Sequence, residues 1–211
     1  MEEKLVVAPD GSLYCGGVGG ILRLVLPDDL DGEVRGEIVF PDKNARLALS
    51  RDGRQALIMA GLANAQYYVE LHLLDLETRA SRRITTHGNR LISVAFDPSG
   101  TAIVTGDWDG IVRVGPASGE EPHLLLGHAE GAYAVATSPD GRWIASASDG
   151  MVILWPMPDV TQPPLHVLPH DALMAKLEAL TNLRVVADPS TSTGWKTEIG
   201  PFPGWKDVPS W

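Results

Sequence analysis

The amino-acid sequence predicts an all-β fold of four repeated units, followed by a short helix and a β-hairpin. The first observation is a recurring turn, spelled APDG, SRDG, DPSG and SPDG, whose glycines are Gly11, Gly53, Gly100 and Gly141. These glycines stand 42, 47 and 41 residues apart. Asp or Ser can cap such a turn, proline presets its φ, and glycine accepts the positive φ that closes it. The spacing therefore indicates one structural unit per turn.

The second observation is that four short apolar runs accompany each turn. In the last unit they are AYAVAT before the turn and RWIASA, MVILW and PLHVL after it. Runs of four to six residues that are separated by Gly, Asp and Pro are typical of short strands. The sequence therefore predicts four units of four strands each, at about residues 1–40, 41–86, 87–127 and 128–170.

The last two units resemble the repeat of the WD40-repeat β-propeller family. His128 stands seven residues before Val135 and 13 before Gly141, which resembles the family's GH…V…SPDG spacing, and His87 opens the preceding unit in the same way. The stretches TGDWDGIVRV and SASDGMVILW are similar to the family's SGSDDGTVRLW. The resemblance covers residues 1 to about 170 and is weakest in the first unit. It implies that each unit is one propeller blade.

The resemblance also implies a structural tetrad of His, Ser or Thr, Asp and Trp within a blade. For the fourth blade the matching residues are His128, Ser146 or Ser148, Asp149 and Trp155. For the third blade they are His87, Thr105 and Asp109, with Gly115 standing where the family has Trp. We expect these residues to hold the blades together and to take no part in catalysis.

The number of blades raises the question of ring closure. Propellers have ~4–8 blades, and the sequence offers four whole blades without a spare closing strand. An open arc or half ring would expose an apolar blade face at each end. The arc would then be completed by self-association into an eight-bladed ring or by another protein chain, or the chain would be the C-terminal piece of a longer protein. A closed four-bladed ring is the remaining alternative.

The third observation is that residues 171–211 are not a further repeat. Leu173, Leu177 and Leu180 recur at helical spacing, and Asp171 is suited to cap that helix. Leu183–Ala187 and Trp195–Ile199 read as the strands of a hairpin. We expect this helix-hairpin tail to pack on the propeller. It resembles the C-terminal ends of some large bacterial WD40-repeat proteins.

Composition narrows the class of partner. The net charge is −10 and the pI about 4.9, which disfavours binding to nucleic acid or to an anionic membrane. The N-terminus does not resemble a secretory signal, and no run approaches the ~20 apolar residues of a membrane span. Cys15 is the single cysteine, so no internal disulfide can form. These features predict a cytoplasmic protein.

No motif in the sequence predicts catalysis, a metal or a cofactor, because HExxH, paired CxxC and GxSxG spacings are all lacking. The sequence favours a non-catalytic protein–protein interaction scaffold. One alternative is a piece of a larger bacterial signalling protein whose activity lies in another domain. The other is a small-ligand-sensing propeller with His and acidic residues in its channel. Candidate partner-contact residues are Tyr67, Tyr68, Trp108, Trp205 and Trp211.

Overall fold

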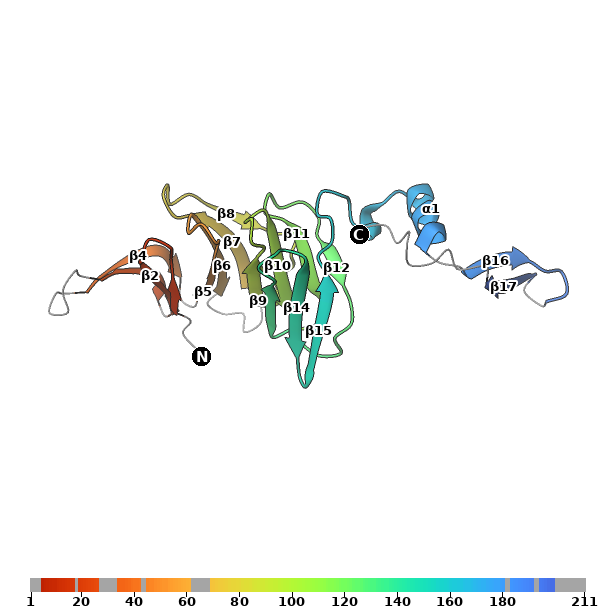
Figure 1. The fold of residues 1–211 in the computed structure, drawn as a ribbon, viewed down its shortest axis with the longest axis horizontal. Helices are drawn as coiled ribbons and strands as arrows, with labels where there is room; N and C mark the ends of the chain where they lie inside the picture. Colours follow the sequence, from red (N-terminus) through yellow and green to blue (C-terminus); the bar gives the residue numbers. More distant parts are fainter. Residues whose placement is uncertain are drawn as a thin grey trace. The chain divides into compact units, whose positions relative to one another are not determined.

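A computed structural model describes residues 5–17, 19–26, 34–42, 45–61, 69–180, 183–191 and 194–199. The chain divides into two compact units, Met1–Thr161 and Gln162–Trp211. The first unit contains four antiparallel sheets, and the second contains a helix and a hairpin (Figure 1). The predicted all-β class, with a helix and a hairpin in the tail, is confirmed.

The four sheets follow one another along the chain, and we call them blades one to four. Blade one consists of β1 (Leu5–Val7), β2 (Leu13–Gly17), β3 (Gly19–Val25) and β4 (Arg35–Asp42). Blade two consists of β5 (Ala45–Leu49), β6 (Gln55–Gly61), β7 (Val69–Asp75) and β8 (Ser81–Ile84). Blade three consists of β9 (Leu91–Phe96), β10 (Ala102–Asp107), β11 (Val112–Pro116) and β12 (His123–Leu125). Blade four consists of β13 (Ala134–Thr137), β14 (Trp143–Ser148) and β15 (Met151–Pro156). Within each blade every strand pairs with the next strand of the sequence.

The glycine turns join the first two strands of each blade, as the sequence predicts. In blade two the Gly53 N–H donates to the Ser50 carbonyl at 3.0 Å, and Gly53 has a φ of 71°. In blades one, two and four the third turn residue is an Asp that accepts hydrogen bonds from neighbouring turn residues, whereas in blade three the accepting Asp is the first turn residue, Asp97. In blade four the Ser138 hydroxyl and the backbone N–H of Arg142 lower the pKa of Asp140 to about 2. These turns are therefore locally determined by their own side chains.

In the described part of the chain the hydrophobic core forms three layers, each between two successive blades. Ile21 and Ile58 lie in the layer between blades one and two. Ile103 lies in the layer between blades two and three, and its neighbour Val104 lies in the layer between blades three and four. Both side chains are 0% exposed. Because successive side chains of a strand point to opposite faces, a strand between two blades is apolar on both sides.

Blade four differs from the prediction in having three strands. The run PLHVL was expected to be its fourth strand, but Leu165–Val167 form a single 3₁₀ turn, η1. Prolines explain the difference: Pro164 precedes this turn, and Pro163 and Pro169 stand close by. Proline has no N–H to donate to a neighbouring strand. The segment also belongs to the second compact unit, because the division falls after Thr161.

In the second unit, α1 (His170–Leu180) precedes β16 (Leu183–Ala187) and β17 (Trp195–Ile199). The helix begins one residue earlier than expected, so Asp171 lies in its first turn and is not its cap. A carboxylate there still interacts favourably with the helix dipole. The hairpin strands have the predicted bounds. Residues 200–211, including Trp205 and Trp211, lie outside the described residues. Within the described ranges, no helix has the length and hydropathy to cross a membrane.

Candidate interaction site at one edge of blades three and four

The interior of blade four contains three of the predicted tetrad residues in direct contact. The indole N–H of Trp155 donates to the Ser146 hydroxyl at 2.8 Å, and His128 Nε2 lies 2.6 Å from the same oxygen. The rings of His128 and Trp155 meet edge to face with centroids 6.4 Å apart. Ser146, 1% exposed, is therefore the hydroxyl residue of this cluster, whereas Ser148 is half-buried near the hairpin end.

Blade three has a smaller version of this cluster. His87 is 0% exposed, and its Nδ1 lies 3.0 Å from the Thr105 hydroxyl. Its Nε2 is buried without a hydrogen-bond partner and faces Gly115, the position at which Trp is missing. Burial, and secondarily the nearby Arg113 guanidinium, lower the pKa of His87 to about 3. His87 is therefore neutral at physiological pH. Its surroundings, a buried hydroxyl and the interior of the blade, are those of a structural residue.

The predicted acidic members of the two tetrads do not bond to these histidines. Asp109 is exposed and pairs with Arg90 at 2.6 Å. In blade four the β14–β15 connection is only two residues long, which leaves Asp149 exposed at its tip, and His128 Nδ1 is buried without a hydrogen-bond partner.

The acid that organises the blade three turn is Asp107. Its carboxylate accepts the backbone N–H groups of Asp109 and Ile111, both at 2.9 Å, and pairs with Arg113 at 2.5 Å. Asp107 is 3% exposed. The family resemblance implies a structural role for Asp109 in this turn, whereas in the structure Asp107 makes these contacts. The position of Asp107 in the sequence favours this role, because its carboxylate can reach the backbone N–H groups of the residues two and four positions later.

Trp108 and Tyr133 form an aromatic pair on the surface above this buried acid. Their rings meet edge to face with centroids 5.9 Å apart. Trp108 is 40% exposed and Tyr133 43% exposed. Trp108 comes from the β10–β11 turn and Tyr133 from the β12–β13 connection, so the two blades contribute together. The sequence identified Trp108 as a candidate but missed Tyr133, because their proximity depends on how the blades pack.

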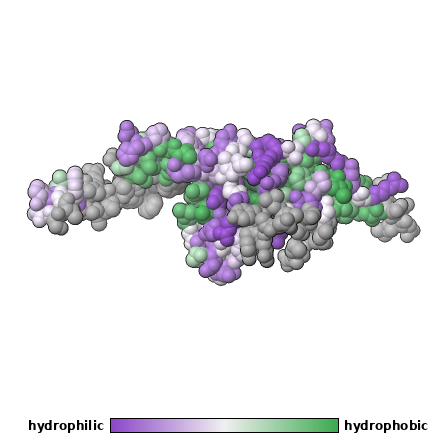
Figure 2. Space-filling view, turned by 180° about the vertical axis from the view of Figure 1, so that it is seen from behind, coloured by the Kyte–Doolittle hydropathy of each residue, from purple (hydrophilic) through white to green (hydrophobic). Residues whose placement is uncertain are grey.

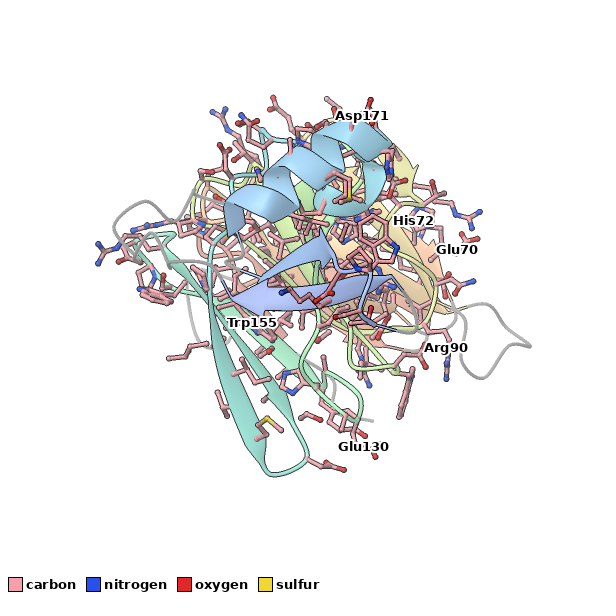
Figure 3. All side chains as sticks on the ribbon, turned by 90° about the vertical axis from the view of Figure 1, so that its right-hand side faces the viewer. Glu70, His72, Arg90, Glu130, Trp155 and Asp171 are labelled. Carbon is pink, nitrogen blue, oxygen red and sulfur yellow. The ribbon has the colours of Figure 1, made fainter. Side chains whose placement is uncertain are left out.

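Hydrogen bonds between connections fix the pair in place. The backbone N–H of Trp108 donates to the carbonyl of Arg90 at 3.1 Å. The backbone N–H of Ala132 donates to the carbonyl of Asp107 at 2.9 Å. The exposed Arg90–Asp109 ion pair lies beside them. Arg90 and Glu130, which lie in two of these connections, are both labelled at the lower right of Figure 3. We call Arg90, Trp108, Asp109 and Tyr133 the loop patch.

The other candidate groups do not converge in the described part of the chain. No three His, Cys, Asp or Glu side chains among those residues are placed to hold a metal ion. His72 is half-buried, and its Nε2 lies 3.2 Å from the Glu70 carboxylate. Both residues are labelled in Figure 3. A shallow hollow of about 240 Å³ lies at the opposite edge, lined by turn residues that include Arg51, Asp97 and Pro139. Tyr67 and Tyr68 lie outside the described residues.

Successive antiparallel meanders that pack face to face define a protein of the β-propeller class. Residues 79–114 and 119–156 match the family model of the WD domain, G-beta repeat. These two segments run from the outer strand of one blade to the third strand of the next, over β8 to β11 and over β12 to β15. These two segments of the chain are therefore WD40 repeats. A search of curated proteins found no match to it.

Proposed function

We propose that this WD40-repeat protein is a non-catalytic scaffold that binds a partner protein through the loop patch. WD40 domains generally mediate protein–protein interactions. The observation that supports this site is the half-exposed pair of Trp108 and Tyr133. Trp, Tyr and Arg are the residue types that contribute most of the binding free energy at protein interfaces, and the loop patch contains one of each.

The local structure favours binding because it is already ordered. Buried Asp107 fixes the β10–β11 turn by accepting three hydrogen bonds. Trp108 lies in this turn. A partner that docks on Trp108 would therefore order few side chains, which reduces the entropy that association costs. The Arg90–Asp109 ion pair lies at the rim, where it would contribute to orientation more than to affinity.

A catalytic role has less support. His87 and His128 lie inside blades, where each faces a hydroxyl group of its own sheet. A pKa of about 3 makes His87 a poor base at neutral pH. The net charge of −10 favours a protein partner over nucleic acid or an anionic membrane, and the single free cysteine fits the cytoplasm. Completion of the ring by self-association depends on other surfaces, the outer faces of the end blades.

Co-purification with variants tests this proposal. The tagged protein is expressed in its own cells, and the proteins that it captures are quantified by mass spectrometry. A partner should be captured by wild type and at least about tenfold less by both Trp108→Ala and Tyr133→Ala. Trp195→Ala is the matched control, because Trp195 is 57% exposed and lies in the β16–β17 hairpin.

Direct contact is then tested with a photo-crosslinking amino acid at position 108. The crosslinked protein should be the one that the alanine variants fail to capture. Equal capture by wild type and both loop-patch variants, with unchanged circular dichroism, would refute the proposed site.

A further inference from the structure

The outer face of blade four is apolar throughout. We call it the trailing face; its main residues are Ala136, Trp143, Ala145, Ala147, Val152 and Leu154. They share one face because the register pairs Ala136 with Ala145 and Ala145 with Leu154, and likewise Ala147 with Val152. Val152 is 68% exposed, Leu154 65% and Trp143 46%. The opposite face of the same strands contacts blade three through Ile144.

The outer face of blade one is also apolar. We call it the leading face; its main residues are Leu5, Val7, Leu13, Leu22, Leu24 and Ile38. The pairings Leu5 with Cys15, Cys15 with Leu22, and Leu22 with Ile38 place them on one face. Val7 is 64% exposed, Leu5 57% and Ile38 54%. Hydrophobic surface is visible on blade one at the right of Figure 2.

Repeat positions show what covers such a face. Val112 stands two residues after Gly110, as Val152 stands two after Gly150. Val112 is 0% exposed because blade four packs on it, whereas no blade among the described residues packs on Val152, which is 68% exposed. The trailing face therefore occupies the repeat positions that are buried between blades elsewhere in the chain, and it is apolar like them.

The leading face has the same relation to a buried surface. Leu5 stands six residues before the glycine of its turn, as Leu47 does before Gly53. Leu47 is 2% exposed and packs in the layer between blades one and two. Every junction within the chain thus pairs the trailing side of one blade with the leading side of the next.

We propose that two copies of this chain associate head to tail, with the trailing face of each copy against the leading face of the other. The two junctions would continue the series of blade–blade layers and close a ring of eight blades. Neither face carries a charged side chain among the residues named, so the pairing buries no unpaired charge. A head-to-tail contact that closes gives a finite ring, whereas one that does not close gives a filament. The inference does not depend on the loop patch.

Variants on each face test the proposal by their mass in solution. We expect wild type to have twice the monomer mass of 22.6 kDa by light scattering and native mass spectrometry. Leu154→Glu on the trailing face and Leu5→Glu on the leading face should each raise the dissociation constant at least about 100-fold and give monomers. Leu126→Glu is the control, because Leu126 is 67% exposed and lies outside both faces. It should stay dimeric.

Mixing the two monomeric variants distinguishes lost contact from lost folding. Leu154→Glu retains an intact leading face, and Leu5→Glu retains an intact trailing face. An equimolar mixture should therefore form a dimer through the one unaltered junction, although neither variant dimerises alone. Formation of this mixed dimer also shows that both variants are folded.

Other outcomes overturn the proposal. They are a monomeric wild type, a dimer that survives either face variant, and assemblies larger than two copies. A mixture that stays monomeric also contradicts head-to-tail pairing. Trp108→Ala should remain dimeric, so a failure of the loop patch to bind a partner is distinguishable from a failure of this inference.

Discussion

The indole N–H of Trp155 on β15 donates to the hydroxyl of Ser146 on β14 at 2.8 Å. This bond links two strands inside blade four. His128 Nε2 contacts the same Ser146 oxygen. The Ser146 hydroxyl is therefore shared by three elements of the blade: the connection before β13, strand β14 and strand β15.

Removal of this hydroxyl should weaken blade four. Ser146→Ala leaves the Trp155 N–H and His128 Nε2 without their common partner in a buried site, which costs about 1–3 kcal/mol of unfolding free energy. Urea denaturation followed by tryptophan fluorescence measures the change. Ser148→Ala is the matched control on the same strand and should change the free energy by less than about 0.5 kcal/mol. Equal effects of the two substitutions would contradict the shared role of Ser146.

Asp107 should contribute more to stability than Asp109. Asp107→Asn removes the charge that pairs with the mostly buried Arg113, and we expect a loss of about 1.5–3 kcal/mol. Asp109→Asn removes only an exposed pair with Arg90, which is worth about 0–1 kcal/mol. Thermal and urea unfolding of both variants provide the comparison. A larger loss for Asp109→Asn would restore the role that the family resemblance implies for it.

His87 should make stability depend on pH below neutrality. Its pKa is about 3 in the folded chain and about 6.5 when unfolded, so the unfolded chain binds more protons between these values. Unfolding free energy should therefore fall as pH decreases from 6.5 towards 3, by up to about 1.4 kcal/mol per pH unit from this residue.

The pH dependence is tested with His87→Gln, which cannot titrate. This variant loses packing and has lower stability at pH 7, but the slope of its unfolding free energy between pH 4 and 6 should be smaller than that of wild type. An unchanged slope would mean that His87 does not titrate as described.

Gly106 should be intolerant of a side chain. A Cβ at this position would lie 2.5 Å from the Ala132 carbonyl oxygen and 2.5 Å from Ser93 Oγ, which themselves hydrogen-bond at 2.8 Å. Gly106→Ala must therefore displace backbone at the junction of blades three and four, at a cost of about 1–3 kcal/mol. Gly36→Ala is the control, because its Cβ would meet only the flexible ends of the Leu24 and Leu22 side chains. Melting temperatures of the two variants show whether they differ.

The sequence predicted most strands because the signals for them are local. The turn glycines and the apolar runs around them depend on residues close in the chain, and the same holds for the β16–β17 hairpin. The sequence also contains a sign that blade four lacks a fourth strand. Pro163, Pro164 and Pro169 surround its apolar residues, whereas the prediction of a strand there followed from the four apolar runs that accompany each turn.

The candidate site was less predictable because it depends on contacts between blades. Trp108 could be recognised as a turn residue, but Tyr133 becomes its neighbour only after blade four packs on blade three. The role of Asp107 likewise depends on the shape of its turn and on the position of Arg113. Periodicity specifies which face of a strand is apolar, but it does not specify which surface residues meet.

The layered core has a consequence for how cooperatively the chain unfolds. Among the described residues, blades two and three each pack against two blades, whereas blades one and four each pack against one. In such a nearest-neighbour system the stability of a unit is its own free energy plus one coupling term per junction. In a single copy, amide protons of β6 and β10 should then exchange most slowly, and those of the end blades should exchange by partial opening that leaves the centre intact. A single copy, such as a monomeric Leu154→Glu or Leu5→Glu variant, would lose its structure from the ends inward, one blade at a time. In the proposed ring of two copies every blade has two neighbours.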